Sequence, residues 1–280
     1  KFNTVYHFTD LNDFDVSHYQ NYPQSTIGYF LFTFDNSNWF YCTASMISKS
    51  IAVAAGHCVH DQAQPGSSSG WIKQGIFVPG CINCPDGYFS NNFYAPFNLA
   101  SAAAVVTTYG WYNIAQLDQG YDISLIVLNK RNGTSNEMGT YTGTLGFCYS
   151  GCLWNNNYLT QAGYPRNLAN GDWIFYGQHL SISDGADYQS GTAATGGSSG
   201  GPYIANIGTV YNSDSDQGQF ATRNIVFATN SWKYNDNSLK IAGASSLSGP
   251  SDSNQFKAMF NIACSYAQSL HGSGSCSMLP

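Results

Sequence analysis

The chain has 280 residues, 43% of them hydrophobic, which suffices for the core of one large domain or two small ones. Charged residues make up only 9% and the formal net charge is −6, so a nucleic-acid partner is not expected. No apolar run approaches the roughly 20 residues of a membrane-spanning helix, so no membrane partner is expected either. The first residues, Lys1-Phe-Asn-Thr4, do not resemble a signal peptide, and we interpret the chain as the mature form of an exported protein.

In chain order, residues 1–26 are polar and aromatic without a clear period, and we interpret them as an N-terminal arm. Short β-type runs separated by Gly and Asn turns then follow, a pattern typical of an all-β sandwich or a pair of barrels. The runs cover residues 27–34, 39–44, 51–55, 71–78, 102–108, 123–128, 140–148, 158–163, 173–182, 203–207, 225–232 and 239–244. The polar stretch 129–136 divides them, so we expect one unit over 27–135 and a second over 136–280.

The end of the chain predicts a single helix. Ser251 or Ser253 can cap its start, and Gly272 stops it. Its apolar residues recur at helical spacing and should face the core: Phe256, Met259, Phe260, Ala263, Ala267 and Leu270.

Eight cysteines, an even number, indicate an oxidising environment and about four disulfides, so we expect a secreted protein. Three pairs lie close enough in sequence to close local loops: Cys81 with Cys84, Cys148 with Cys152, and Cys264 with Cys276. The first two pairs also have the ligand spacing of a four-cysteine zinc site. In a secreted chain we favour the disulfides, and we predict neither a metal nor a cofactor.

A glycine-rich stretch, Gly197-Ser-Ser-Gly-Gly-Pro202, surrounds two serines with residues that permit unusual backbone conformations. A serine in such a turn can present its Oγ while neighbouring N–H groups point at a carbonyl oxygen under attack. Alone, the stretch also fits a Gly/Ser-rich surface loop, so its interpretation depends on the rest of the chain.

A histidine and an aspartate lie at the ends of apolar runs. His57 follows the run 51–55, and Asp122 begins the nearly continuous apolar run up to residue 128. A carboxylate beside a buried strand is costly unless it is paired, and a histidine N–H is a suitable partner. Asp118, four residues earlier, is the competing acid.

These stretches, in the order Ala54-Ala-Gly-His57-Cys58, Asp122-Ile-Ser-Leu125 and Gly197–Pro202, resemble the chymotrypsin-like serine proteases. The resemblance implies an all-β fold of two six-stranded antiparallel β-barrels followed by a C-terminal helix. It implies that Ser199 is the nucleophile, that His57 is its general base and that Asp122 orients His57.

The resemblance also implies a disulfide between Cys42 and Cys58, and an oxyanion hole formed by the N–H groups of Gly197 and Ser199. The chain departs from the family pattern at two places. Gly56 precedes the histidine where the family usually has Ala, and Ser198 precedes the nucleophile where the family has Asp.

The segment Gln161-Ala-Gly-Tyr-Pro165 and the run from Thr195 to Pro202 resemble the glutamyl-endopeptidase branch of the family. Ala193 stands where trypsins carry an Asp, so the resemblance does not imply cleavage after Lys or Arg. Ser231 and Ala194 stand where glutamate-specific relatives have other residues, so glutamate specificity is not implied either. The substrate-binding residues that the resemblance implies are Ala193, Ala194, Thr195, Ser231, Trp232, Lys233 and Gly243.

The sequence therefore predicts a secreted, monomeric serine endopeptidase that acts on protein or peptide substrates and is not trypsin-like in specificity. Lys233 either pairs with an acidic substrate group or is a solvated loop lysine. Two other functions stay open: a catalytically silent binding module of the same fold, and an aromatic-rich carbohydrate-binding domain, suggested by 6 Trp and 20 Tyr. The aromatic residues are scattered through the apolar runs and fit a protein core better.

Overall fold

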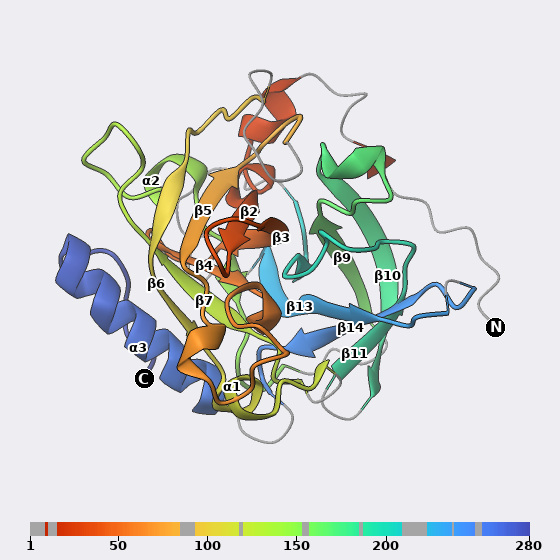
Figure 1. The fold of residues 1–280 in the computed structure, drawn as a ribbon. Coiled ribbons are helices and arrows are strands. Elements are labelled where there is room, and N and C mark those ends of the chain that lie inside the picture. Colours follow the sequence, from red (N-terminus) through yellow and green to blue (C-terminus); the bar gives the residue numbers. More distant parts are fainter. Residues whose placement is uncertain are drawn as a thin grey trace.

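A computed structural model of the chain describes residues 9–10, 16–84, 93–117, 120–152, 157–184, 187–208, 223–236, 238–249 and 254–280. Two closed β-barrels lie side by side, and a long helix lies against one of them (Figure 1). The prediction of two six-stranded antiparallel barrels with a C-terminal helix is confirmed.

The first barrel closes in the strand order β2-β3-β4-β7-β6-β5. Its strands are β2 (Ile27–Thr33), β3 (Trp39–Met46), β4 (Ile51–Ala54), β5 (Gln74–Pro79), β6 (Ala100–Thr107) and β7 (Ser124–Leu128). Strands β2, β4 and β7 are buried along their whole length, which explains why their sequences read as continuous apolar runs and not as alternating ones.

The second barrel is formed by β9 (Asn157–Gly163), β10 (Phe175–Asp184), β11 (Asp187–Gly191), β12 (Pro202–Ala205), β13 (Ile225–Lys233) and β14 (Ile241–Ser246). The path β10-β11-β14-β13-β12-β9 closes because β10 also pairs with β9. Two short strands extend this sheet: β1 (Thr9–Asp10) pairs with β10, and β8 (Gly146–Phe147) runs parallel to β13. Part of the expected N-terminal arm is therefore an added strand.

The C-terminal helix α3 (Asn254–His271) follows the second barrel in sequence but contacts β4, β6 and β7 of the first (Figure 1). Five of the six apolar residues predicted to face the core are buried. Leu270 is the exception, at 41% exposed, because it lies in the last turn of the helix. Gly272, with φ of +102°, follows the last helical residue as predicted, whereas both proposed capping serines fall outside the described residues.

The prediction of a strand over residues 140–148 is wrong. The chain forms the short helix α2 (Gly139–Thr142) there and then the two-residue strand β8. Strand β11 and the helix α1 (Tyr109–Ile114) were not predicted. Strand β11 contains polar residues and no apolar run, and α1 is a single short turn started by the Thr108 side chain, which accepts a hydrogen bond from Trp111 N at 2.9 Å.

One hydrophobic cluster runs through both barrels and α3. It includes Tyr29 and Val53 of the first barrel, Ile204 and Val226 of the second, and Phe260 of the helix. Burial of this shared core fixes the two barrels relative to each other, which a site built from both requires.

The described cysteines form four disulfides: Cys42–Cys58, Cys81–Cys84, Cys148–Cys152 and Cys264–Cys276. The disulfides expected from the sequence, including the pairing that the family resemblance implied, are therefore present. None of the helices in the described part of the chain combines the length and the apolar character of a membrane-spanning helix.

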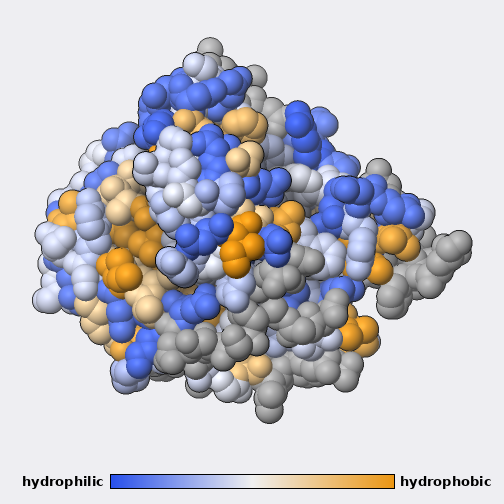
Figure 2. Space-filling model, turned by 60° about the horizontal axis from the view of Figure 1, so that its bottom comes forward, coloured by the Kyte–Doolittle hydropathy of each residue, from blue (hydrophilic) through white to orange (hydrophobic). Residues whose placement is uncertain are grey.

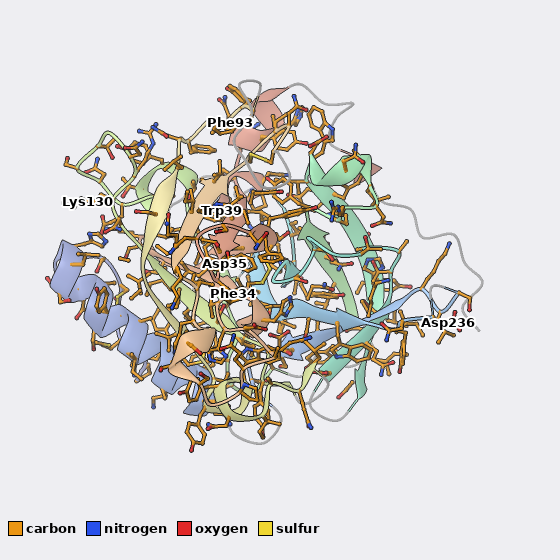
Figure 3. The ribbon with its side chains drawn as sticks, viewed as in Figure 1. Phe34, Asp35, Trp39, Phe93, Lys130 and Asp236 are labelled. Carbon is orange, nitrogen blue, oxygen red and sulfur yellow. A yellow bond between two sulfur atoms is a disulfide. The ribbon has the colours of Figure 1, made fainter. Side chains whose placement is uncertain are left out.

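The side chain of Asp35 holds the turn between β2 and β3. Phe34, Asp35 and Trp39 lie at the turn between β2 and β3 (Figure 3). Hydrogen bonds from the backbone N–H groups of Asn38 and Ser37 lower the pKa of Asp35 to about 2, so the carboxylate stays charged and holds the turn.

Apolar residues gather in separate patches on the face shown in Figure 2. A groove of about 520 Å³ between the first barrel and α3 is lined mainly by apolar residues, among them Val105 and Met259.

Candidate active site

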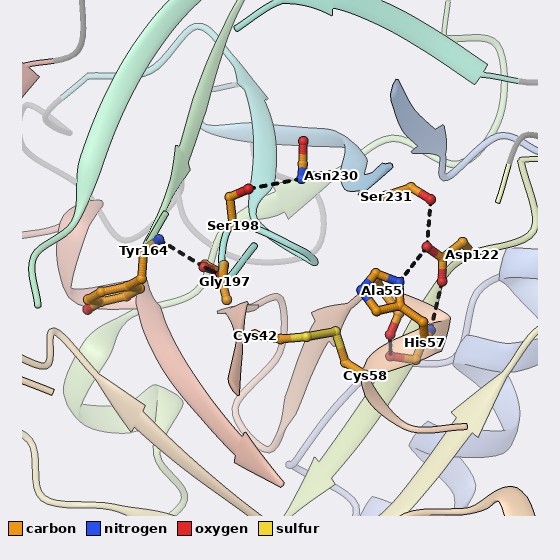
Figure 4. The surroundings of a disulfide bond; sticks show 12 residues. Cys42, Ala55, His57, Cys58, Asp122, Tyr164, Gly197, Ser198, Asn230 and Ser231 are labelled. Atoms are coloured by element: carbon orange, nitrogen blue, oxygen red, sulfur yellow. Dashed lines mark hydrogen bonds and ion pairs between the residues drawn. A yellow bond between two sulfur atoms is a disulfide. The ribbon is translucent and has the colours of Figure 1, made fainter. Parts of the chain in front are cut away.

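His57 and Asp122 meet because their strands are neighbours in the first barrel. His57 lies in a one-turn 3₁₀ helix (Gly56–Cys58) just after β4, and Asp122 lies just before β7, which pairs with β4 in antiparallel register. The backbone N–H of His57 donates to Asp122 Oδ1 at 2.7 Å, and His57 Nδ1 lies 2.8 Å from Asp122 Oδ2 (Figure 4). Asp122 is fully buried, whereas the His57 side chain is 23% exposed. Asp118, the competing acid, lies outside the described residues.

The buried carboxylate controls the protonation of His57. Burial of the ring opposes its positive charge, but the negative charge of Asp122 and the hydrogen bond to it outweigh burial, so the pKa of His57 is raised. With Nδ1 engaged by Asp122, Nε2 is the ring nitrogen left for other chemistry. A histidine held in this way can act as a general base through Nε2.

Gly56, the departure from the family pattern beside His57, is explained by Trp111. A Cβ built on Gly56 would lie 2.7 Å from Trp111 Cγ, closer than real Cβ contacts come. Trp111 is completely buried, and its Nε1 donates to the carbonyl oxygen of His60 at 3.1 Å. The missing side chain at position 56 therefore lets the indole pack beneath the histidine turn.

The second barrel contributes a hydroxyl to the same carboxylate. Ser231 Oγ donates to Asp122 Oδ2 at 2.5 Å (Figure 4). Ser231 lies where the pairing of β13 with β14 shifts register between Asn230 and Trp232, and such an irregularity re-aims a side chain. The sequence placed Ser231 only among the substrate-binding residues, and nothing in its pattern indicated the contact with Asp122.

The loop that contains Ser199 is held against β3 of the first barrel. Thr43 N donates to Ser199 O at 2.8 Å, and Thr43 Oγ1 donates to Gly197 O at 2.8 Å. Cys42, next to Thr43, forms the disulfide with Cys58, next to His57. Strand β3 thus connects the serine loop to the histidine turn.

Ser199 itself is half-buried, and within the described residues no hydrogen bond joins its Oγ to His57. Such a bond is often long in the absence of substrate and shortens when substrate binds. The structure therefore brings Asp122 into direct contact with both His57 and Ser231, and it holds the Ser199 loop against β3, whose Cys42 is bonded to Cys58.

Two backbone N–H groups of the loop are available to a ligand. Among the described residues, Gly197 N and Ser199 N donate to no other group, whereas Ser198 N, between them, donates to Thr195 O at 3.2 Å. Gly197 has φ of +90°, and a Cβ there would collide with the Tyr41 ring, so glycine is required. Two free N–H groups on alternate residues of one turn can bind an oxyanion.

A pocket of about 320 Å³ lies beside the loop. Four of the predicted substrate-binding residues line it: Ala193, Ala194, Thr195 and Lys233. The other lining residues are Asn167, Thr192, Tyr234, Asp236, Leu239, Lys240 and Ile241, with Asp236 at the outer tip of its loop (Figure 3).

Trp232, Gly243 and Ser231 were expected to bind substrate but do not line this pocket. The Trp232 ring packs against Gly243, and its Nε1 donates to the buried Asp187 at 2.7 Å. In a strand, neighbouring side chains face opposite sides, so Lys233 faces the pocket while Trp232 turns away from it.

Asn167 is a pocket residue that the sequence did not indicate. Its Nδ2 donates to Ala193 O at 2.9 Å, and its Oδ1 accepts from Thr195 N at 3.0 Å and from Thr195 Oγ1 at 2.7 Å. Asn167 therefore holds Ala193 and Thr195, which form part of the pocket wall, in place. Its position two residues after Pro165 carries no recognisable signal.

Comparison with known proteins gives matches only among solved structures. No protein-family model and no curated protein matches the sequence. The protease Anisep from Arthrobacter nicotinovorans is 22% identical with a TM-score of 0.63, covering 87% of this chain and 97% of its own.

Two further solved structures are similar over most of the chain. The thermostable serine protease AL20 from an extremophilic microorganism is 21% identical with a TM-score of 0.62, covering 90% of this chain and 97% of its own. A Glu endopeptidase is 14% identical with a TM-score of 0.62, covering 95% and 98%. At these identities the likeness concerns the fold. The two closed barrels and this likeness to three proteases show that the chain has the chymotrypsin fold.

Proposed function

We propose that this protein is a secreted serine endopeptidase in which Ser199, His57 and Asp122 form the catalytic triad. Ser199 Oγ attacks the carbonyl carbon of a peptide bond while His57 Nε2 takes the hydroxyl proton. His57 then gives this proton to the leaving amine, and an acyl-enzyme remains on Ser199. Water attacks the acyl group with His57 again as base, which releases the acid and regenerates the serine.

Each remaining residue has a role set by its position. Asp122 orients His57 and stabilises the imidazolium that forms during each transfer. The N–H groups of Gly197 and Ser199 bind the oxygen that becomes negative in the tetrahedral intermediate. Residues 231–233, at the end of β13, pair with the extended backbone of the substrate as an added strand.

The observation that carries this proposal is the double contact between His57 and Asp122. A fully buried carboxylate on Nδ1 of a partly exposed histidine is the arrangement that general-base catalysis through Nε2 needs. Burying a carboxylate is costly unless its charge is paired. A histidine with only a structural role would not require a buried carboxylate beside it. The free N–H groups of the Ser199 loop support the same reaction.

The pocket beside Ser199 supports a specificity that is not trypsin-like. Ala193 at the pocket wall offers no carboxylate to bind a basic side chain. Lys240 also lines the pocket, and its positive charge disfavours a basic substrate side chain there. The substrates proposed are proteins or peptides, and four disulfides support a secreted enzyme.

The proposal is tested by mapping cleavages in a diverse peptide mixture by mass spectrometry, with the intact protein beside Ser199→Ala and Ser269→Ala. Ser269 lies on the exposed side of α3, so its variant controls for a serine-to-alanine change. We expect cleavages with the intact protein and Ser269→Ala, and none with Ser199→Ala.

The residue before each cleavage reports the preference of the pocket. Clustering after Lys or Arg would contradict the specificity proposed here. Activity retained in Ser199→Ala would overturn the catalytic assignment, and a folded intact protein that makes no cleavages would favour the silent binding module.

A further inference from the structure

Behind the Ser199 loop lies a group of polar side chains that are all buried. They form one hydrogen-bonded group within the second barrel, and we call them the buried polar network: Gln161, Ser190, Thr192, Ser198, Tyr203 and Asn230. None is more than 5% exposed. Burial raises the pKa of Tyr203 to about 12, so its hydroxyl stays neutral. The network therefore holds its neighbours by hydrogen bonds alone, without charge.

Asn230 holds the Ser199 loop at three points. Its Nδ2 donates to Ser198 Oγ at 3.2 Å (Figure 4). Its carbonyl oxygen accepts from Gly200 N at 2.7 Å, and its own N–H donates to Gly201 O at 2.9 Å. The residues on both sides of Ser199 are therefore tied to one residue of β13.

Along the path from Ser198 through Asn230 and Gln161 to Thr192, the donors and acceptors can be arranged in one direction only. Ser198 Oγ donates to the carbonyl oxygen of Thr195 at 2.6 Å, so it must accept from Asn230. Asn230 Oδ1 is then left to accept from Gln161 Nε2, at 2.9 Å. Gln161 Oε1 accepts in turn from Thr192 Oγ1 at 2.8 Å. Because each amide has a single possible orientation, the side chains cannot flip without leaving a buried group unpaired.

The far end of the network reaches the wall of the pocket of about 320 Å³ beside the Ser199 loop, which we call the specificity pocket. Thr192 Oγ1, which donates to Gln161, accepts from Ala194 N at 3.2 Å. Both residues line the pocket. One continuous chain of hydrogen bonds therefore joins the pocket wall to the loop that carries Ser199.

The residue after Asn230 acts on the other half of the site. Ser231 donates to Asp122, whereas Asn230 donates to Ser198 (Figure 4). Neighbouring side chains on a strand point to opposite sides. Two consecutive residues of β13 therefore bind Asp122 and the Ser199 loop, respectively.

We propose that Asn230 is a positioning residue that holds the Ser199 loop in its catalytic conformation, with Gln161 carrying the same constraint to the specificity pocket. This inference rests on the proposed function of Ser199. Loss of the Asn230 side chain removes the hydrogen bond to Ser198 Oγ and so loosens the turn that aims the Gly197 and Ser199 N–H groups. Because those groups stabilise the transition state more than the bound substrate, the loss appears in kcat and not in KM.

The experiment compares Asn230→Ala with Thr229→Val. Thr229 is the preceding residue of β13, is fully buried and lies outside the network, so its variant reports the effect of disturbing the same strand. We expect Asn230→Ala to lower kcat at least tenfold with KM within threefold, and Thr229→Val to stay within twofold. Active-site titration with a fluorophosphonate corrects both values for any unfolded protein.

Two further variants test the route of the effect. If Asn230 acts through Ser198, then Ser198→Ala combined with Asn230→Ala should lower kcat no more than the more damaging single variant. Gln161→Leu should raise KM for the preferred peptide more than it lowers kcat, because it releases Thr192 in the pocket wall.

Amide hydrogen exchange of residues 196–204, followed by mass spectrometry, tests the positioning role without turnover. We expect faster exchange in Asn230→Ala and unchanged exchange in Thr229→Val. An active protein in which Asn230→Ala keeps both kcat and exchange overturns the inference but leaves the proposed function standing. A protein without Ser199-dependent cleavage, in which Asn230→Ala still speeds exchange, overturns the proposed function but not the role of Asn230 in holding the loop.

Discussion

Asp122 holds His57 at two points, with Oδ1 on the backbone N–H and Oδ2 on ring Nδ1. We expect Asp122→Asn to keep the fold but to lower kcat by about 10⁴-fold, because the amide favours the wrong tautomer of the ring. Steady-state kinetics on a peptide substrate measure this effect. A loss of less than tenfold would show that His57 does not depend on Asp122 as general base.

The pH dependence of activity should follow His57. Burial opposes its protonation, but the Asp122 charge and hydrogen bond raise its pKa above 6.5. Catalysis requires the neutral ring, so kcat/KM should fall as the pH falls, with a midpoint above pH 6.5. The residual activity of Asp122→Asn should have a lower midpoint, because the negative charge that raises the pKa of His57 is gone. A midpoint that does not move would mean that another group controls the profile.

The disulfide Cys42–Cys58 should stabilise both the fold and the site. Its cysteines are 16 residues apart, so replacing both by Ala should cost about 3 kcal/mol of unfolding free energy. The pair Cys264–Cys276, 12 residues apart and remote from His57, serves as control with a similar cost. Denaturant titration gives the stabilities. Among molecules that remain folded, only the first double variant should lose activity, and equal activity in both would contradict this role.

Gly56→Ala should destabilise the protein, although the change adds only one methyl group. The new methyl group would press on the buried Trp111 ring, and overpacking of this kind costs about 1–3 kcal/mol. Gly274→Ala is the matched control, because a Cβ there meets no atom within 4 Å and its φ is not positive. Thermal or urea unfolding of both variants measures the difference, and equal stabilities would contradict the packing described for Trp111.

His179 of β10 should make the fold sensitive to acid. Burial lowers its pKa to about 4, from 6.5 in the unfolded chain. Between these values the unfolded state binds more protons, so stability falls as the pH falls, by about 3 kcal/mol in total. The raised pKa of His57 acts in the opposite direction, favouring the fold below pH 6.5.

Urea titrations at pH 7, 5 and 4 separate the two contributions. His179→Leu should remove most of the loss on acidification, whereas the change His18→Gln, at a half-buried site, should leave it in place. An unchanged acid sensitivity in His179→Leu would show that other groups cause it.

The sequence predicted the strands from short β-type runs bounded by turn residues, a signal that each strand carries by itself. The two six-stranded barrels were predicted from the resemblance to chymotrypsin-like proteases. It missed β11, whose residues Asp187–Gly191 are buried mainly through pairing with β10 and β14. It predicted a strand over 140–148 because Thr, Tyr and Phe there favour strands, whereas the chain forms α2, at whose start Gly139 N donates to Lys49 O at 2.8 Å.

For the candidate site, the sequence allowed the residues with chemistry of their own to be proposed, but it did not indicate the residues that hold them in place. His57, Asp122 and Ser199 stand in short recognisable stretches. Thr43, Asn167 and Asn230 are ordinary polar residues whose partners lie tens of residues away, as with Asn230 and Gln161, 69 residues apart. Only the folded chain brings such partners together.

The packing of α3 on the first barrel has a consequence for biosynthesis. The barrel with His57 and Asp122 is made first, yet the helix that covers β6 and β7 is made after the second barrel. A ribosome-bound chain therefore keeps this apolar face uncovered until α3 emerges, after Ser199 and Ser231 have already been made. The packing of the barrel that carries His57 and Asp122 is therefore completed only after the second barrel has been made.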